Sequence, residues 1–233
     1  MNIALILAGG SGTRVGANCP KQFIKVKGKP IVCYTLENFQ KHQLIDFIEI
    51  VCHPDYLAYM DQLCIKYGFT KVKKIVKGGS TYQESVINGL EGLNGLCKSD
   101  DIILTHMAAS PIVSKELISD SLRVCALFDN AISKNDSVLC LGNVNNNFTD
   151  MDINRDTIVG LNTPQTVKYQ LLVDLYGQAK KDGILEKIDP HMTSLMFAMK
   201  QKMYFSKGSS LNFKITTADD VKLFEAYVIA NKL

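Results

Sequence analysis

The sequence predicts an α/β fold: a Rossmann-like, mainly parallel sheet with helices on both faces. Short runs rich in Ile and Val alternate along the chain with segments whose apolar residues recur at i, i+3 and i+4. This alternation is typical of parallel strands joined by helical crossovers. A glycine-rich loop follows the first run. Because ligands bind beyond the carboxyl ends of such strands, the loops that follow the strands are the candidate site.

The elements follow one another in a regular order as far as residue 141. Strands are predicted at 3–7, 47–52, 73–76, 101–106 and 137–141, and helices at 31–42, 55–68, 81–93 and 115–128. After a polar, Asn-rich excursion, a helical period resumes over 163–183 and ends at Gly183. A last strand is predicted at 212–216, before a helix that has Thr217 as its N-cap and acids in its first turn.

Composition favours a single globular domain, residues 1–233. Hydrophobic residues make up 46% of the chain and charged residues 21%, and no apolar run approaches the ~20 residues that span a bilayer. The net charge of +3 is too small to indicate nucleic-acid binding, and the lysines of 71–77 alternate as on a solvated strand. The seven cysteines are scattered singly, which predicts a reducing, cytoplasmic location and no cysteine metal site.

The loop after the first predicted strand combines bare backbone with two cations. It reads ILAGGSGTRVGANCPKQF over residues 6–23 and contains Arg14 and Lys21. Glycine backbone N–H groups can approach a phosphate closely because no side chain intervenes. The spacing fits neither a GxGxxG dinucleotide fingerprint nor a GxxxxGK[ST] P-loop. Two cations beside bare backbone suit a triphosphate; the alternative is a surface turn with two solvated cations.

This loop resembles the nucleotide-binding loop of the cytidylyltransferases that act on methylerythritol phosphate or ribitol phosphate, down to its PKQF ending. Further segments are similar to motifs of that family and occur in the same order. They are GGSTYQESVINGL (78–90), DIILTHMAASPIV (101–113), TPQ (163–165) and NFKIT (212–216). The resemblance implies an enzyme that joins the α-phosphate of CTP to a phosphorylated polyol with Mg²⁺ carried mainly by the CTP phosphates, for isoprenoid precursors or cell-surface polymers.

The resemblance also implies roles for individual residues. Arg14, Lys21 and Lys214 would be the catalytic cations. Ala8, Gly9, Gly10, Gly12, Gly79, Ser80 and Ser85 would bind the nucleotide, and Arg155, Thr163, Met107 and Ser110 would lie against the acceptor. The family forms homodimers through an arm, which implies a homodimer here with a shortened arm at 142–162.

The chain departs from the family pattern on the acceptor side. Met107 and Ser110 stand where the family has Asp and Arg, Tyr82 replaces another Arg, and Ser194 replaces an Asp. A thioether is a poor partner for Mg²⁺, which prefers hard oxygen ligands. The hypothesis is therefore that the enzyme still uses CTP but accepts a different phosphorylated polyol or sugar.

Two other functions stay open at this point. Met107 and Ser110 also fit a CTP-binding protein that has lost turnover. A dehydrogenase of Rossmann type would need an acid after the second strand, and Asp55 offers one, but the first loop lacks the required spacing. His106 is interpreted as structural, because an attacking phosphate needs no general base.

Overall fold

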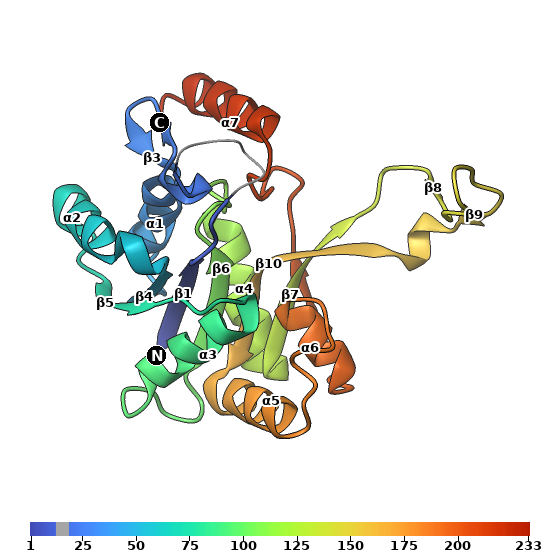
Figure 1. Ribbon diagram of the computed structural model, residues 1–233, viewed down its shortest axis with the longest axis horizontal. Coiled ribbons are helices and arrows are strands. Elements are labelled where there is room, and N and C mark those ends of the chain that lie inside the picture. The colour runs from blue at the N-terminus through green and yellow to red at the C-terminus, as the bar shows by residue number, and fades with distance from the viewer. Residues whose placement is uncertain (13–18) are drawn as a thin grey trace.

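The computed structural model describes residues 1–12 and 19–233, which form a seven-stranded sheet between two layers of helices (Figure 1). The strand order is β11-β7-β10-β6-β1-β4-β5. These strands are β1 (Asn2–Ala8), β4 (Phe47–Cys52), β5 (Val72–Lys77), β6 (Ile102–Met107), β7 (Asn130–Asp136), β10 (Val159–Lys168) and β11 (Phe205–Lys207). β1, β4, β5 and β6 run parallel, β10 is antiparallel to both of its neighbours, and β11 is parallel to β7.

The remaining elements cover this sheet or extend from it. The helices are α1 (Ile31–Lys41), α2 (Leu57–Tyr67), α3 (Tyr82–Leu93), α4 (Lys115–Phe128), α5 (Tyr169–Lys181), α6 (Met192–Ala198) and α7 (Ala218–Ala230). Short 3-10 helices are η2 (Lys21–Phe23), η3 (Pro54–Tyr56) and η4 (Arg155–Thr157), and two small antiparallel pairs join β2 (Lys25–Val26) to β3 (Lys29–Pro30) and β8 (Leu141–Gly142) to β9 (Asp152–Ile153). None of the helices described in the structure is long and apolar enough to cross a bilayer.

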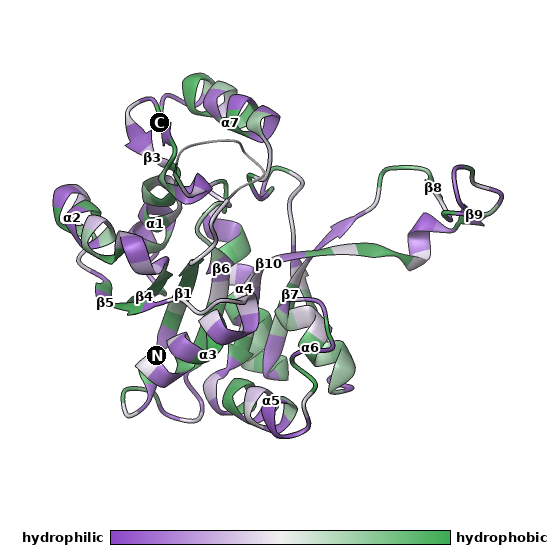
Figure 2. Ribbon diagram, viewed as in Figure 1, coloured by the Kyte–Doolittle hydropathy of each residue, from purple (hydrophilic) through white to green (hydrophobic). Residues whose placement is uncertain are grey.

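The central strand β1 explains why the first predicted run is almost entirely hydrophobic. Alternate side chains of a strand point to opposite faces. Ile6 therefore packs with α1, α2 and α4, whereas its neighbour Leu5 packs with α3, α5 and α6. Both side chains are fully buried, and Figure 2 shows the central strands in the hydrophobic colour. A strand that is covered by helices on both faces has no solvent-facing side, so polar residues do not alternate with apolar ones along it.

Most predicted elements are confirmed. β1, β4, β5 and β6 lie where strands were predicted, α1 to α3 overlap their predicted segments, and α4 matches its segment residue for residue. The predicted cap of the last helix is confirmed as well. The Thr217 hydroxyl accepts the Asp220 backbone N–H, and the Asp220 carboxylate accepts the Thr217 N–H in return. These elements have strong local sequence signals, such as helix caps and periodic apolar residues, and the tertiary contacts agree with them.

Three predicted segments are wrong. Residues 137–140 are not a strand, because β7 ends at Asp136 and pairing resumes only at Leu141. Residues 163–168 are the end of β10 rather than the start of α5. Residues 212–216 run extended but form no ladder; among the described residues, their link to the sheet region includes the bond from the Ile215 N–H to the Ala109 carbonyl, 2.8 Å. A short apolar run in the sequence does not by itself distinguish a strand from a helix or a loop. Whether the segment becomes a strand depends on the strands available to pair with it.

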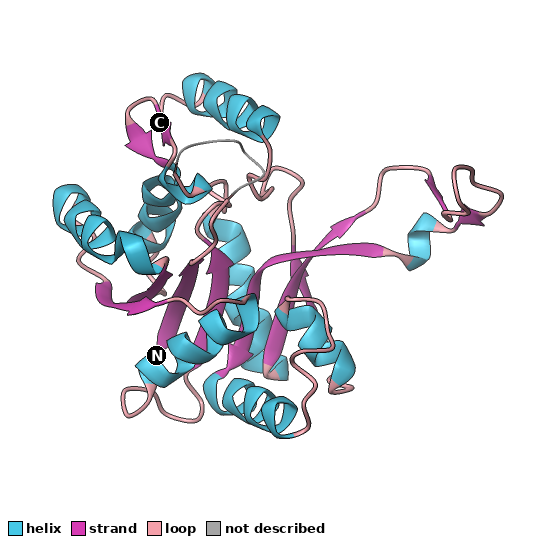
Figure 3. Cartoon of the chain, in the orientation of Figure 1, coloured by secondary structure: helices cyan, strands magenta, loops and turns pink. Residues whose placement is uncertain are grey.

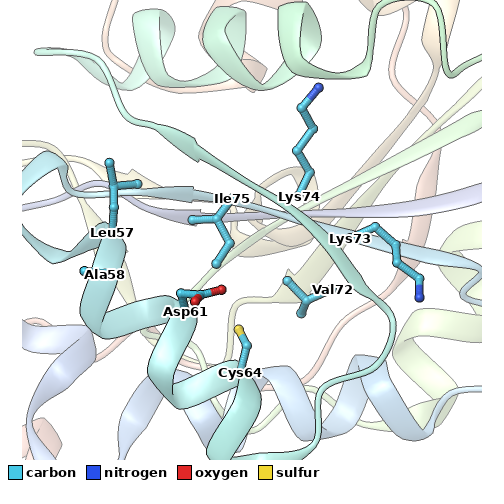
Figure 4. A pocket seen from close by; sticks show the side chains of 8 residues that line it. All are labelled: Leu57, Ala58, Asp61, Cys64, Val72, Lys73, Lys74 and Ile75. Atoms are coloured by element: carbon cyan, nitrogen blue, oxygen red, sulfur yellow. The ribbon is translucent and has the colours of Figure 1, made fainter.

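Strand β5 is one edge of the sheet and is rich in lysine. Lys73 and Lys77 are exposed, which confirms the solvated lysine face predicted from the sequence. Figure 4 shows a cavity of about 460 Å³ between β5 and α2, where Asp61 and Cys64 face the start of the strand. This cavity lies along the side of the strand, away from its carboxyl end.

A single carboxyl group is buried in the sheet without a hydrogen bond. Glu49 on β4 is fully buried, and neither of its carboxylate oxygens has a partner among the described residues. Burial raises the pKa of Glu49 to about 8, although the Lys74 charge lowers it. A side-chain carbon at Gly92 would lie 2.2 Å from Glu49 Oε1, so the glycine leaves the space this carboxyl occupies.

The segment between β7 and β10 leaves the body of the molecule as an arm, residues 137–158 (Figures 1 and 3). Its outer part consists of loops, the β8–β9 pair and η4. The predicted excursion, 142–162, is therefore displaced, since the arm begins before it and residues 159–162 already belong to β10. Several large apolar side chains of the arm are exposed: Val138, Leu139, Val144, Phe148, Met151 and Ile158.

Candidate active site

Several predicted site residues follow the carboxyl ends of β1, β5 and β6: Ala8, Gly9, Gly10, Gly12, Gly79, Ser80, Ser85, Met107 and Ser110. The chain passes from β1 to β4 and β5 on one side, and then crosses back to β6 on the other side of β1. In open α/β sheets such a reversal marks the position, beyond the carboxyl ends of the strands, at which ligands bind; here that position lies beyond the ends of β1 and β6. Leu7 and Met107, near the ends of these strands, lie side by side in the register. We call this region the crevice.

The loop after β1 is tied down by one glutamine. Gln22 is buried, and its amide Nε2 donates to the carbonyls of Ala8, 2.7 Å, and Gly10, 3.0 Å. The Ala8 carbonyl also accepts the His53 N–H at 3.1 Å. Gly10 faces open space, because a side-chain carbon placed there would meet nothing within 4 Å. The protein thus engages the carbonyls of this turn and leaves one glycine open to a ligand.

Lys21 lies directly against the same turn. Gly12 has φ +70°, and a side-chain carbon there would lie 2.5 Å from the Lys21 backbone nitrogen. Only glycine adopts this conformation and this close approach at low cost. Lys21 itself is largely buried, which is unusual for a lysine. Arg14, the other predicted cation of the loop, lies outside the described residues.

The loop after β5 presents a second stretch of bare backbone to the first. A side-chain carbon at Gly9 would lie 3.3 Å from the Ser85 hydroxyl and 3.7 Å from the Gly78 Cα. The Ser85 hydroxyl accepts the Gly79 N–H at 3.1 Å and donates to the Thr81 carbonyl at 2.9 Å. Ser85 therefore shapes the loop, and Gly9 and Gly78 approach each other beside its hydroxyl.

Ser80 is held at the exposed edge of this loop. Its N–H and its hydroxyl both donate to the Glu84 carboxylate, at 2.7 and 2.6 Å. These hydrogen bonds lower the pKa of Glu84. A side-chain carbon at Gly79 would lie 2.2 Å from Glu84 Cβ, so Gly79 allows the chain to turn tightly into α3. Contacts within the chain therefore define the shape of this loop.

The loop after β6 contains the residues that depart from the family pattern. Met107 is half-buried at the end of the strand and packs with the apolar cluster that also contacts Tyr82. Ser110 is fully buried, so its side chain does not face the open crevice. His106 is buried beside it and bonds the Ser110 carbonyl through Nε2 at 2.9 Å. Burial lowers the pKa of His106 to about 4, so the imidazole is neutral and its contacts fit a structural role.

A third wall of the crevice comes from the C-terminal part of the chain. The Ile215–Ala109 bond places the neighbouring residue, Lys214, beside the loop after β6. The Lys214 charge also acts on His191, whose pKa is lowered first by burial and then by this lysine. The His191 ring lies 6.0 Å from that of Tyr82, at the start of α3. Lys214 and the start of α3 therefore flank the same space.

Two predicted acceptor residues lie apart from each other. Thr163 is buried in β10, and its carbonyl is bonded by Asn212 at 2.6 Å. Arg155 is exposed on the arm, where its Nη1 donates to the Val138 carbonyl at 3.4 Å. Arg155 begins η4 in the arm, and the arm extends away from the body of the chain (Figure 1). The structure of one chain therefore does not bring Arg155 to the crevice.

Sequence reasoning missed three residues that shape the site. Gln22 is visible in the PKQF motif, but nothing in the sequence indicates that its amide holds two carbonyls. Asn212 precedes Lys214 by two residues, and only the structure shows its bond to β10. His191 precedes a helix, α6, that was not predicted. The PKQF and NFKIT motifs could have drawn attention to Gln22 and Asn212 beforehand, whereas no motif contains His191.

Comparison with known proteins gives a consistent result. The family model described as "IspD: 2-C-methyl-D-erythritol 4-phosphate cytidylyltransferase" matches residues 2–230. A ribitol-5-phosphate cytidylyltransferase of Lacticaseibacillus paracasei is 35% identical over 236 residues, and a 2-C-methyl-D-erythritol 4-phosphate cytidylyltransferase of Clostridium acetobutylicum is 36% identical over 238 residues. Each match covers 100% of this chain and 100% of the relative.

Solved structures share the fold. The 4-diphosphocytidyl-2C-methyl-D-erythritol synthase of Anaerococcus prevotii superposes with a TM-score of 0.82 at 24% sequence identity, over 98% of both chains. A 2-C-methyl-D-erythritol 4-phosphate cytidylyltransferase of Thermus thermophilus superposes with a TM-score of 0.78 at 21% identity, over 98% of this chain and 100% of the other. The α/β, Rossmann-like fold predicted from the sequence is thereby confirmed.

Proposed function

This chain belongs to the family of 2-C-methyl-D-erythritol 4-phosphate cytidylyltransferases, and from that premise we propose that its acceptor is the phosphate of a five-carbon polyol. The chain is a CTP-dependent enzyme that transfers CMP to a phosphorylated polyol and forms a CDP-polyol. Ribitol and 2-C-methylerythritol, the polyols in the names of the two relatives, both contain five carbons. The observation that carries the acceptor proposal is that both relatives match the whole chain and are named for phosphates of five-carbon polyols. The close approach of the glycine turns at Gly9 and Gly78 supports the CTP half of the reaction.

The reaction needs positioning and charge neutralisation more than covalent help from the protein. An oxygen of the acceptor phosphate attacks the α-phosphorus of CTP. The bond from that phosphorus to the oxygen bridging the α- and β-phosphates breaks, and pyrophosphate leaves with the electron pair. The second ionisation of a phosphate monoester has a pKa of about 6, so at neutral pH the attacking oxygen already carries charge and needs no general base.

Lysine side chains on both sides of the crevice suit this chemistry. Lys21 adjoins the first turn, and Lys214 adjoins the loop after β6. Fixed cations stabilise the charge that grows on the equatorial and leaving oxygens during phosphoryl transfer. Arg14 would add a third cation from the same loop as Lys21. In this proposal Lys21 and Arg14 act on the triphosphate from one side, and Lys214 acts on the reacting phosphates from the opposite side.

Magnesium enters the site with the nucleotide in this proposal. In the described part of the chain, no group of three His, Cys, Asp or Glu side chains could hold a metal ion. The oxygens of a triphosphate are hard ligands of the kind that Mg²⁺ prefers. The ion supplies charge neutralisation to the phosphates when bound, and Lys21 and Lys214 remain the chain's own contribution.

The arm is proposed to join two copies of the chain. Its exposed apolar side chains, such as Val144, 89% exposed, and Phe148, 54% exposed, would be unfavourable in water on a monomer. Arg155 on the same arm would then reach the crevice of the other copy as an acceptor-phosphate ligand. Light scattering coupled to size exclusion tests this: a dimer that becomes monomeric in Val144→Asp supports it, and a wild-type monomer contradicts it.

The substrate assay tests the function directly. The protein is incubated with CTP, Mg²⁺ and one of ribitol 5-phosphate, 2-C-methylerythritol 4-phosphate, erythritol 4-phosphate or glycerol 3-phosphate, and pyrophosphate release is measured. We expect release with at least one five-carbon acceptor and with CTP in preference to ATP. Binding of CTP without release from any acceptor would instead support a protein that has lost turnover.

A further inference from the structure

We propose that Asn212 is a positioning residue for Lys214, because it fastens the loop that carries this lysine to strand β10. The inference rests on the proposed function, since it assumes that Lys214 acts on the phosphates. Asn212 is fully buried, and its amide Nδ2 donates to the Thr163 carbonyl at 2.6 Å. The loop on which it lies follows β11 and runs over residues 208–217.

The bond is returned by a second asparagine on β10. Asn162 Nδ2 donates to the Asn212 carbonyl at 2.8 Å, and Asn162 Oδ1 accepts the Thr163 N–H at 2.8 Å. Each asparagine side chain thus bonds the backbone of the other's segment. We call Asn162, Thr163 and Asn212 the asparagine clip.

The clip occurs at a point where the sheet cannot make these bonds itself. The register between β10 and β7 is irregular between Asn162 and Gln165, so backbone groups there fall outside the regular ladder. Buried backbone groups need partners, and side-chain amides supply them. The Thr163 carbonyl would be left without this partner if the Asn212 amide were removed, at a cost larger than the bond itself contributes.

Lys214 lies between two anchors. On one side Asn212 holds the chain to β10, and on the other side the Ile215 N–H bonds the Ala109 carbonyl at 2.8 Å. The capping box of α7 begins immediately afterwards, at Thr217. A lysine side chain is long and flexible, so its charge is placed reproducibly only if the backbone that carries it is fixed. The asparagine clip is the anchor on the N-terminal side of Lys214.

A second buried asparagine provides a matched control. Asn130 at the start of β7 donates to the Lys202 carbonyl at 3.0 Å and accepts the Tyr204 N–H at 3.1 Å. It ties the segment before β11 to the sheet, as Asn212 ties the segment after β11. Because β7 runs toward the crevice, its first residue lies at the opposite end of the sheet. Asn130→Ala therefore removes the same kind of contact far from the reaction.

The test is a double-mutant cycle of Asn212→Ala and Lys214→Ala, with Asn130→Ala alongside. Kinetic constants for CTP and acceptor are measured together with melting temperature. We expect Asn212→Ala to lower kcat by about 10-fold to 100-fold, as a misplaced catalytic group does, and to have no further effect in the Lys214→Ala background. We expect Asn130→Ala to lower the melting temperature comparably without lowering kcat. Equal loss of kcat in both backgrounds, or an equal loss in Asn130→Ala, overturns the proposal.

Two further measurements keep the test decisive. Asn212→Leu keeps roughly the size of the side chain but removes the donor, so we expect the loss seen in Asn212→Ala; wild-type kcat in this variant overturns the proposal. If the wild type releases no pyrophosphate with any acceptor, the proposed function fails. In that case the CTP affinity of each variant in the double-mutant cycle is measured by calorimetry. Weaker binding in Asn212→Ala that disappears in the Lys214→Ala background supports the clip, and additive losses overturn it.

Discussion

Within the nucleotide half of the crevice, each glycine turn is shaped by side-chain hydrogen bonds inside a short stretch of chain, whereas the acceptor half joins segments far apart in the sequence. Gly79 and Ser85, bonded to each other, are 6 residues apart, and Gly10 and Gln22 are 12 apart. On the other side, Asn212 and Thr163 are 49 residues apart, and Asn162 and Asn212 are 50 apart. In a site built this way, substitutions that alter the acceptor half can change the acceptor while the nucleotide half continues to bind CTP.

The largest expected effect comes from removing a cation of the nucleotide half. We expect Lys21→Ala to lower kcat/KM for CTP by about 10²-fold to 10³-fold, because a fixed charge beside the phosphates is lost. Pyrophosphate release at limiting CTP measures it. Lys25→Ala, an exposed lysine in β2, is the control and should retain activity. An equal loss of kcat/KM in the two variants would show that Lys21 contributes no more to the reaction than a solvent-exposed lysine.

A smaller effect is expected from disturbing the turn itself. Gly79→Ala places a carbon 2.2 Å from Glu84 Cβ, so the loop must shift. We expect KM for CTP to rise about 10-fold, with KM for the acceptor unchanged, because only the nucleotide half moves. Gly177→Ala on α5 is the control, since an added carbon there meets nothing within 4 Å. A rise in KM for the acceptor alone would contradict the assignment of this turn.

The acceptor half is probed through the arm. We expect Arg155→Ala to raise KM for the acceptor by about 10-fold and to leave KM for CTP unchanged, since a charge-assisted contact to the acceptor phosphate is removed. Steady-state kinetics with each substrate varied in turn separate the two constants. Arg123→Ala, an exposed arginine on α4, is the control. If Arg155→Ala changes only KM for CTP, the division into two halves is wrong.

The smallest effect on the reaction is expected from Glu49→Gln, which lies in neither half. Folding keeps this carboxyl protonated up to a pKa of about 8, whereas the unfolded chain releases the proton near pH 4.5. The raised pKa therefore stabilises the fold at low pH, and this stability is lost as the pH rises toward 8. Between pH 5 and pH 8 the wild type should lose about 3 kcal/mol more unfolding free energy than Glu49→Gln.

Urea unfolding at the two pH values measures this difference, and both KM values should stay as in the wild type. The same pH dependence in wild type and variant would show that the carboxyl is not held protonated.

The same contrast explains what could be predicted from the sequence. β1, β5 and α3 carry apolar runs, glycines and a cap that act within a few residues, and these elements lie where they were predicted. β7 and β10 read as loop or helix because polar residues such as Lys134 and Asn162 interrupt the apolar pattern. What makes them strands is pairing with each other and with β6, which no local pattern contains.

The residues that depart from the family pattern on the acceptor side also depend on contacts that the sequence does not reveal. Ser110 was predicted to lie against the acceptor, yet its side chain is enclosed beside His106. Whether a loop residue faces the crevice depends on how the chain turns after β6, and sequence position alone does not give that direction. The roles of Met107 and Thr163 at the acceptor stay predictions.

The lysines of strand β5 also bear on how copies of this chain can meet. An open sheet edge offers unpaired backbone groups to any other strand, and charged side chains along it discourage such joining. Lys73 and Lys77 stand in the solvent along this edge. Strand-to-strand joining of successive molecules through the β5 edge, the route by which edge strands produce fibrous aggregates, is therefore disfavoured.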